Sequence, residues 1–451
     1  MAYLGNTAAV VGGSIAGLAS AQMLSRYFDE VVVLERDEIS TEPKLHKSIP
    51  QGNHYHTLLA GGYRVMSKLY PELSDRLIAR GAVTLQAPGD ICFHIEGRRA
   101  YNPTGDVLER RNFDIQSFSL TRGLLESTIR EITAETANIR FIPQARVTKL
   151  STSDGSVTGV KYTCNDEVCL LKTDLILETA GRSSRLPKYL ESLGYGAVEE
   201  TSIGVDFGYS SAKVAAPDGF AEPEPMHIMF GRPGIDTAGA IMAEVEKGLW
   251  HVSLAGRLGD YPPGDPEGFV AFARSLGKPV LDQILGDGDN FRSEITTYRY
   301  PRSQWRHYDK MPHFPDGIIP VGDSVVSFNP VYGQGMSSAA TQIQAVDTAL
   351  AERDREGQGV DGLWKGVLPE IAARASVPWG MAAAQDFQFD GTVGERPSDL
   401  QTQVAFNIAL GKACADDPEL HKAFTEVAHL DRSPGDLMLE PYISSIGRYL
   451  D

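Results

Sequence analysis

A glycine-rich segment near the start of the chain has the residue types needed to hold a phosphate group. It reads VVGGSIAG, and serine stands where the G-x-G-x-x-G pattern has its middle glycine. The first glycine allows a tight turn, the small serine can donate a hydrogen bond, and the last glycine lets a helix lie close to a strand. A helix that begins there directs free N–H groups toward an anion. The candidate phosphate-binding residues are Gly12, Gly13, Ser14, Ile15, Ala16 and Gly17.

The elements around this segment support that interpretation. Residues 8–12 are a short apolar run typical of a buried strand, residues 14–28 suit a helix, and residues 31–35 suit a second buried strand. The pattern therefore predicts a βαβ unit with the glycines between strand and helix. Glu35 ends the second strand, where a carboxylate can accept the ribose hydroxyls of an adenosine. The alternative is a βαβ unit that binds nothing, and the motif alone does not separate NAD from FAD.

A second candidate segment spans residues 317–342, GIIPVGDSVVSFNPVYGQGMSSAATQ. We expect a buried strand that ends near Asp323, a loop, and a long helix that begins near Gly335. Free N–H groups at such a helix start stabilise an anion by about 0.3–1 kcal/mol. The simpler interpretation of Asp323 is a helix cap or a turn former.

This second segment resembles the G-D motif of the para-hydroxybenzoate hydroxylase-like flavoprotein monooxygenases, which bind FAD. The resemblance implies that Asp323 bonds a ribityl hydroxyl, that Gly335 and Met336 face the N(1)/C(2)=O edge, and that the preceding loop flanks the flavin ring. The loop residues concerned are Pro330, Tyr332 and Gly333, although Tyr332 could instead be a packed aromatic. Further FAD contacts are expected at Arg36, Gln51, Arg122, Val147 and Gly181.

Two of these contacts depend on shorter motifs. The stretch SLTRGLLESTIR, which we expect to form a helix from about Thr121, resembles the R-x-x-L helix whose arginine reaches the cofactor. The alternative for Arg122 is a solvated helix arginine. In TDLILETAGRSSR, Ala180 precedes Gly181 where the larger family has aspartate, which puts direct NAD(P)H binding in doubt. Since there is no second G-x-G-x-x-G, electrons would come from a transient NAD(P)H or from a separate flavin reductase.

Four other stretches narrow the resemblance to a bacterial subgroup that includes polyether-pathway olefin epoxidases: HKSIPQGNHYHTLLAGG, GRSSRLPKYLESLGYG, VDFGYSS and SFNPVYGQGM. The implied reaction inserts one oxygen atom of O2, through a flavin C(4a)-hydroperoxide, into a hydrophobic secondary metabolite. Epoxidation of an olefin is favoured. The alternatives are aromatic hydroxylation and an oxygen-independent reduction of the geranylgeranyl-reductase type. A flavin halogenase is disfavoured because its W-x-W-x-I-P stretch is absent.

No catalytic side chain is named by the sequence, because the oxygen chemistry would be that of the flavin. A phenolic substrate would need a base, whereas an olefin would not. His54 and His56 could face one way on a strand and bind a metal, but no third ligand follows, so we place them in a loop beside the flavin and expect no metal. Candidate wall residues for the substrate are Phe207, Tyr209, Met226, Met229, Trp250 and Phe328.

The fold class predicted is α/β, with a Rossmann-like FAD-binding domain, an inserted mixed β-sheet substrate domain and C-terminal helices. We assign residues 1–75, 111–185 and 306–360 to the FAD-binding domain and 76–110 and 186–305 to the substrate domain. Residues 361–451 form the helical region. Four consecutive strands are expected between residues 139 and 181.

Composition and charge limit the classes of partner that we expect for this chain. The 451 residues are 42% hydrophobic and carry a net charge of -17, which disfavours nucleic acid and anionic membranes. The N-terminus lacks the features of a signal peptide, and no apolar run reaches the length of a membrane span. The four cysteines form no C-x-x-C pair, so we expect reduced thiols in a cytoplasmic protein. The oligomeric state stays open.

Overall fold

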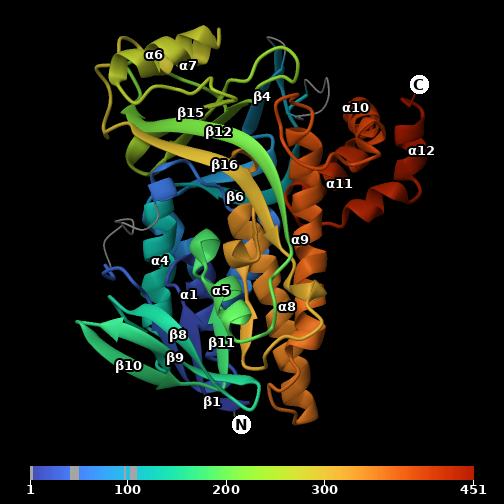
Figure 1. Ribbon diagram of the computed structural model, residues 1–451. Helices are drawn as coiled ribbons and strands as arrows, with labels where there is room; N and C mark the ends of the chain where they lie inside the picture. Colours follow the sequence, from blue (N-terminus) through green and yellow to red (C-terminus); the bar gives the residue numbers. More distant parts are fainter. Residues whose placement is uncertain (1–3, 41–49, 96–97, 102–108, 451) are drawn as a thin grey trace.

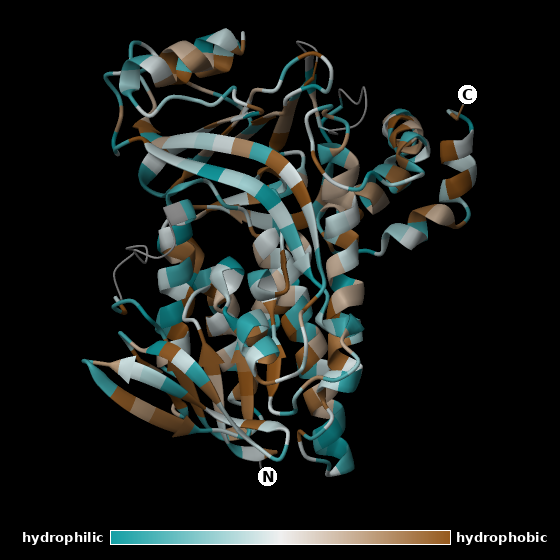
Figure 2. Cartoon of the chain, in the orientation of Figure 1, coloured by the Kyte–Doolittle hydropathy of each residue, from teal (hydrophilic) through white to brown (hydrophobic). Residues whose placement is uncertain are grey.

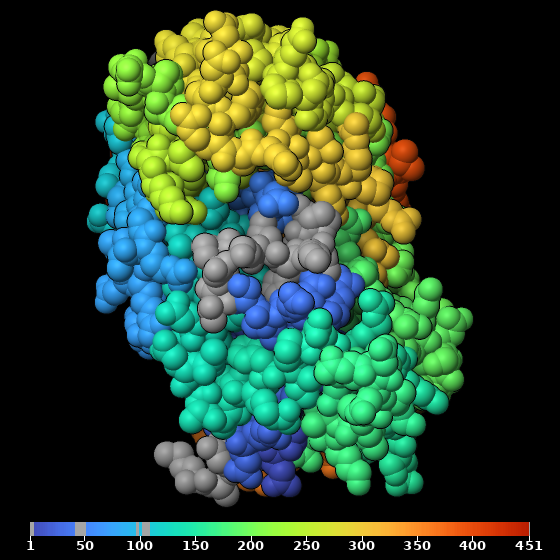
Figure 3. Space-filling model, turned by 90° about the vertical axis from the view of Figure 1, so that its left-hand side faces the viewer, coloured from blue at the N-terminus to red at the C-terminus, as the bar shows by residue number. Residues whose placement is uncertain are grey.

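The computed structural model describes residues 4–40, 50–95, 98–101 and 109–450. Figure 1 shows two stacked bodies and a row of helices along one side. The lower body contains a parallel sheet, and the upper body contains a broad curved sheet. Figure 3 shows both bodies at one face, with N-terminal residues in blue between the yellow and orange upper part and the teal and green lower part.

The lower body is built on a five-stranded parallel sheet in the order β17-β11-β1-β2-β7. Its strands appear brown in Figure 2 because they are continuous apolar runs, as expected for a sheet covered on both faces. Helices α1 and α8 pack against each other beside it. The bounds are β1 Gly5–Val11, α1 Ile15–Leu24, β2 Phe28–Leu34, β7 Ile139–Ile142, β11 Leu175–Glu178, β17 Ile318–Pro320 and α8 Gly335–Glu356.

A small antiparallel sheet, β10-β9-β8, lies beside the parallel one. Its strands are β8 Arg146–Ser153, β9 Ser156–Cys164 and β10 Glu167–Lys172. The prediction of four strands in this part of the chain is wrong, since there are five. The outer two, β7 and β11, join the parallel sheet and only the middle three form the meander.

The upper body is an eight-stranded mixed sheet in the order β18-β16-β12-β15-β14-β13-β4-β5. Only the β13–β4 pair is parallel within it. Strands β3 and β6 form a separate two-stranded ribbon. The bounds are β3 Val83–Pro88, β4 Ile91–Ile95, β5 Arg98–Ala100, β6 Asn112–Ser119, β12 Glu200–Ala215, β13 Met226–Met229, β14 Gly239–Val245, β15 Leu249–Arg257, β16 Thr296–Arg306 and β18 Val326–Ser327.

The two faces of this large sheet meet different partners. Its outer face packs on α6 and α7 through a core that includes Val252, Leu254 and Phe269. Its inner face looks toward the lower body and carries a second core with Ile91 and Met226. The helices are α2 Ala60–Leu69, α3 Leu73–Ala79, α4 Arg122–Ala134, α5 Leu186–Ser192, α6 Pro266–Ser275 and α7 Pro279–Leu285.

The C-terminal part of the described chain is helical, as predicted. Helix α9 Trp364–Asp386 packs along α8, and α10 Leu400–Asp416, α11 Pro418–Ala428 and α12 Tyr442–Gly447 form a bundle with its own small core. Figure 1 shows this bundle in red beside the upper body. Among the described residues, no helix is both long and apolar enough to cross a bilayer. The predicted fold class is confirmed.

Candidate nucleotide-binding site

The glycine-rich segment is the turn between β1 and α1. Gly12 has φ +107°, which favours glycine, and a Cβ there would lie 2.8 Å from the carbonyl oxygen of Thr179. A Cβ on Gly17 would overlap the carbonyl oxygen of Gly12. The absence of side chains at Gly12 and Gly17 therefore lets the start of α1 lie close to the end of β1.

Glu35 follows β2 and is 5% exposed. Its Oε2 accepts a hydrogen bond from the Gly13 N–H at 2.6 Å, and its Oε1 accepts one from the Asp37 N–H at 2.8 Å. The carboxylate therefore lies against the glycine turn. Its acceptance of the ribose hydroxyls of an adenosine stays a prediction.

A buried ion network lies on the other side of the turn. Arg122 begins α4, is 9% exposed, and donates to the Ser14 hydroxyl at 2.9 Å. Ser14 in turn donates to Glu126 at 2.8 Å, and this carboxylate is held between Arg122 at 3.2 Å and Arg130 at 2.6 Å. Arg122 is therefore buried against the glycine turn, and its interpretation as a solvated helix arginine is wrong. Thr121 caps the helix by accepting from the Leu124 N–H.

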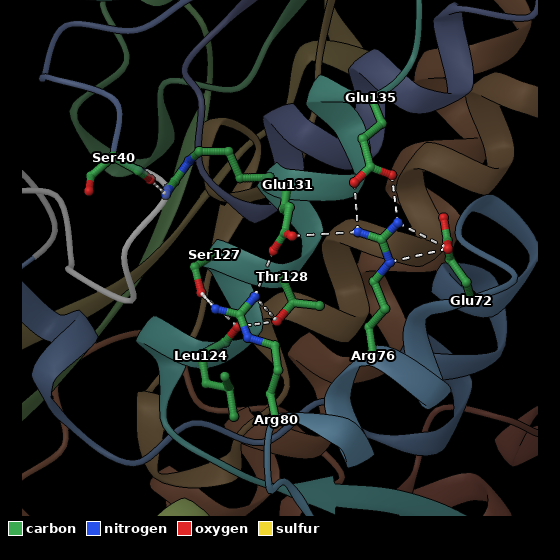
Figure 4. Close-up of polar contacts among 10 residues, drawn as sticks. Ser40, Glu72, Arg76, Arg80, Leu124, Ser127, Thr128, Glu131 and Glu135 are labelled. Carbon is green, nitrogen blue, oxygen red and sulfur yellow. Dashed lines mark hydrogen bonds and ion pairs between the residues drawn. The ribbon is translucent and has the colours of Figure 1, made fainter.

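Helix α4 is also fixed from its opposite side by α3. Figure 4 shows Arg76 and Arg80 reaching across to the carboxylates of α4. Arg76 binds Glu135 at 2.5 Å, and Arg80 binds Glu131 at 3.0 Å. These pairs are partly exposed, so each contributes little by itself, but together they hold the helix that carries Arg122.

The second motif meets the first directly. A Cβ built on Gly322 would lie 3.3 Å from the Cβ of Ala16, so the turn after β17 touches the start of α1. Gly181, three residues after the end of β11, lies beside Asp323. The Gly322 N–H donates to Gln342 of α8 at 2.8 Å, which positions the turn against that helix.

Asp323 presents an acceptor into this region. Its side chain forms no hydrogen bond among the described residues and caps neither the short turn at residues 322–324 nor α8, whose N-cap is Gln334. Its interpretation as a cap is therefore wrong. Burial raises the pKa of this carboxyl, whereas the charges of three arginines lower it. These are Arg182, Arg122 and Arg306.

The loop between β18 and α8 is anchored by a residue that the sequence did not single out. Asp386 of α9 is 0% exposed, and its Oδ1 accepts from Asn329 at 2.9 Å, from the Tyr332 hydroxyl at 2.8 Å and from Arg257 at 3.1 Å. The loop turns at Gly333, where φ is +64° and a Cβ would lie 2.6 Å from Thr57. Tyr332 is therefore at least a packed, hydrogen-bonded aromatic, and its contact with a flavin ring stays a prediction.

The inner face of the large sheet carries a polar chain. The Nδ1 atom of His54 lies 2.7 Å from the Ser211 hydroxyl, which lies 2.6 Å from the Ser253 hydroxyl. Ser253 lies 3.5 Å from Nδ1 of His251, whose Nε2 lies 3.2 Å from the backbone oxygen of Asn53. Burial lowers the pKa of His54 to about 2 and that of His251 to about 3, so both rings are neutral at pH 7. Nε2 of His54 is buried and has no partner among the described residues.

The six candidate wall residues do not form one wall. Side chains alternate along each strand, so Phe207, Tyr209 and Met226 lie on the inner face while Met229 and Trp250 lie on the outer one, under α6 and α7. The assignment of Met229 and Trp250 to the substrate wall was therefore wrong. The sequence alone does not show which face of a sheet each alternating side chain points to. Phe328 packs toward α9, with its ring 6.5 Å from Trp379.

The remaining predicted contacts spread around the site. Arg36 is exposed, just after Glu35. Val147 on β8 is half-buried and accepts from the Tyr189 hydroxyl through its backbone oxygen at 3.5 Å. Gln51 lies in a short turn at residues 50–53 that contacts α4. Pro330 precedes Gly333 in the anchored loop, and Met336 is buried in the first turn of α8. Residues 46–49 of the histidine-containing stretch lie outside the described residues.

Sequence inspection missed Glu126, Arg257 and Asp386. Each is a charged residue in a stretch of small or apolar neighbours, which is a usable signal of a buried pair. Their partners lie on other elements, however, so no spacing rule could name them.

These features fit a dinucleotide such as FAD. A glycine turn leads into a helix, a buried carboxylate accepts a hydrogen bond from the Gly13 N–H of that turn, and a second acceptor, Asp323, lies next to the same turn with arginines around it. Hydroxyl groups and a pyrophosphate are the chemical groups that such acceptors and donors bind.

The architecture defines the class of fold. A parallel sheet with an inserted mixed sheet is the fold of flavin-dependent monooxygenases, and solved structures with this fold match nearly the whole chain. The flavin-dependent brominase Bmp2 is 13% identical with a TM-score of 0.67, covering 99% of each chain. The p-nitrophenol 4-monooxygenase PnpA of Pseudomonas putida is 17% identical with a TM-score of 0.63, covering 95% of this chain and 99% of that one.

In sequence, the chain is similar to Protein Rv3254 of Mycobacterium tuberculosis. The two are 28% identical over 455 residues, which cover 98% of this chain and 92% of that protein. No family model matches the chain.

Proposed function

We propose that this protein is an FAD-dependent monooxygenase that transfers one oxygen atom of O2 to a hydrophobic secondary metabolite. One observation carries the proposal: the glycine turn and the G-D turn, more than three hundred residues apart, touch at Ala16 and Gly322. Two acceptors, Glu35 and Asp323, flank that contact. Bound there, FAD would supply the reaction with O2, and the protein would bind, orient and exclude water.

Within this proposal, the chain's own residues have distinct roles. The turn from Gly12 to Gly17 would bind the pyrophosphate, with Arg122 alongside through Ser14. Glu35 would accept the ribose hydroxyls and Asp323 a ribityl hydroxyl. The loop from Pro330 to Gly333 and the start of α8 at Gly335 and Met336 would meet the flavin ring. The division into FAD-binding, substrate and helical regions belongs to the same proposal.

The substrate would lie between the loop and the inner face of the large sheet. Apolar residues on that face, including Met226 and Tyr209, suit a hydrophobic ligand. For an olefin, shape and orientation would be enough, because epoxidation needs no side-chain base. Epoxidation of an olefin therefore remains the first candidate reaction.

Hydroxylation of a phenol is the second candidate, and the polar chain on the inner face favours it. A backbone oxygen can only accept, so Nε2 of His251 carries its proton and the neutral ring accepts at Nδ1. Ser253 then donates to His251, Ser211 donates to Ser253, and His54 donates from Nδ1. Nε2 of His54 is consequently a bare acceptor for the hydroxyl of a phenol, although its pKa of about 2 makes it too weak a base to remove the proton.

Flavin binding is the first test. The purified chain should be yellow or should quench the fluorescence of added FAD with a stoichiometry of about one. Gly17→Ala should weaken this binding, whereas Gly366→Ala, where a Cβ meets nothing within 4 Å, should keep it. A colourless chain that does not bind FAD would refute the proposal.

Labelled oxygen then distinguishes the reactions. The FAD-loaded chain is reduced with dithionite and mixed with ¹⁸O2 and either squalene or 2-naphthol as a probe. An epoxide carrying one labelled atom supports epoxidation, and a labelled diol of naphthalene supports hydroxylation. His54→Gln should reduce only the second reaction. Turnover that consumes no oxygen would instead identify a reductase.

A further inference from the structure

The outer face of the large sheet carries a cluster that the proposed monooxygenase reaction does not use. Cys92 and His227 are register partners on the parallel strands β4 and β13, and His94 lies two residues after Cys92 on the same face. Cys92 and His227 are each 0% exposed, and His94 is half-buried. Met226 and Ile228 point to the inner face, so this cluster is separated from the candidate substrate region by the thickness of the sheet.

The ligand atoms have the spacing of a metal site. His94 Nε2 and His227 Nδ1 are 3.1 Å apart, Cys92 Sγ lies 3.9 Å from His94 Nε2, and all three atoms lie within 4.8 Å of one another. Zinc binds imidazole nitrogen at about 2.0–2.1 Å and thiolate sulfur at about 2.3 Å, so tetrahedral ligands stand roughly 3.3 to 3.7 Å apart. Small side-chain movements would therefore bring all three onto one ion.

A carboxylate lies near the second ring nitrogen of His227. His227 Nε2 lies 3.8 Å from a carboxylate oxygen of Glu222 and forms no hydrogen bond among the described residues. Metal-bound histidines donate their other ring N–H to such a carboxylate, and this fixes the tautomer that leaves Nδ1 free to bind. Glu222 would thus direct the lone pair of Nδ1 toward the cluster.

Charged groups of both signs surround the cluster. Arg99 binds both Glu222 and Glu224, and Tyr101 donates to Glu224 at 2.7 Å. The charge of Lys278 also acts on His94, so two carboxylates and two cations lie around the ligand atoms. The case for a metal ion therefore depends on the identity and spacing of the three ligand atoms, not on the surrounding charge.

We propose that Cys92, His94 and His227 form a zinc site that joins β4 to β13 on the outer face of the large sheet. A mixed thiolate and imidazole ligand set favours zinc over magnesium or calcium. The fourth position would hold water. The ion would join strands from segments more than a hundred residues apart, near the edge of the sheet.

The test measures metal binding independently of flavin chemistry. The full chain is treated with a chelator, dialysed, and titrated with Zn²⁺ against a chromophoric competitor, and bound zinc is counted by mass spectrometry. Wild type and Cys164→Ser, a control cysteine on β9, should bind one zinc. Cys92→Ser and His94→Gln should bind it more than roughly 100-fold more weakly, since outer-shell changes alone cost about 10- to 100-fold.

Two further readouts identify the ligands. Co²⁺ should produce a thiolate-to-metal band in the near-ultraviolet difference spectrum of the wild type and Cys164→Ser, but not of Cys92→Ser. Zn²⁺ should raise Tm in the same two proteins and not in His94→Gln. If Cys92→Ser does not fold, the His94→Gln variant tests the zinc site by itself, because His94 is only half-buried. Equal zinc binding by His94→Gln and the wild type, or a wild type without the cobalt band, would overturn the proposal.

Discussion

The buried Asp386 gives the sharpest test of how the C-terminal helices support the candidate site. Its carboxylate forms an ion pair with Arg257, whose side chain is 6% exposed, and accepts from Asn329 and Tyr332. Asp386→Ala removes the partner of a buried guanidinium, which costs about 3–5 kcal/mol. The two other donors lose an acceptor at about 1–3 kcal/mol each, although these terms overlap. We expect a total loss of roughly 4 kcal/mol.

The same helix provides a matched control. Glu370 pairs with Arg374 at 2.9 Å, but their side chains are 51% and 29% exposed. Glu370→Ala should therefore cost only about 0–1 kcal/mol. Urea titrations monitored by tryptophan fluorescence give the free energy of unfolding of both variants. Trp379 on α9, whose ring lies 5.6 Å from that of Trp305, reports on this region.

A double variant separates the ion pair from general damage to the helix. Replacing both charges, in Arg257→Met with Asp386→Leu, leaves no unpaired buried charge and should recover much of the stability lost in Asp386→Ala. The reasoning is refuted if Asp386→Ala is no less stable than Glu370→Ala. It is also refuted if the loss of stability in the double variant equals the sum of the losses in Arg257→Met and in Asp386→Leu.

Three further predictions concern the turn, the ion network and the histidines. Gly17→Ala should lower both Tm and flavin affinity, because its Cβ overlaps the Gly12 carbonyl oxygen. The control Gly366→Ala should change neither by much. A Gly17→Ala protein with unchanged Tm and affinity would contradict the close packing of α1. Glu126→Gln should destabilise the chain by about 3–5 kcal/mol in urea titrations, since it leaves two buried arginines facing each other, while the exposed Glu131→Gln should cost about 0–1 kcal/mol. For His54, burial lowers the pKa to about 2, so the folded state stays neutral while the unfolded state gains a proton below about pH 6.5. Stability is therefore lost as the pH falls, by about 2 kcal/mol at pH 5, and the pH dependence of unfolding should shrink by this amount in His54→Gln.

Much of the lower body was predictable because its signals are local. The glycines, the apolar strands and Glu35 lie within one short βαβ unit, so their spacing determines their arrangement. The helix that begins near Thr121 was predicted from its periodicity, and the fold class was predicted from the βαβ unit together with the resemblance to the flavoprotein family. In each case the residues that interact are neighbours in the sequence or have a fixed periodicity.

The remaining features depended on how distant segments pack. Met229 faces the outer side of the large sheet and Met226 faces the inner side. Only the pairing of the strands in the structure shows which side is which. Asp386 lies 57 residues from Asn329, and His227 lies 133 residues from His94. A sequence determines which residue types are available and which local elements they form. The tertiary structure decides which of them meet, because the energy of a buried charge or ligand atom depends on partners that only packing brings within reach.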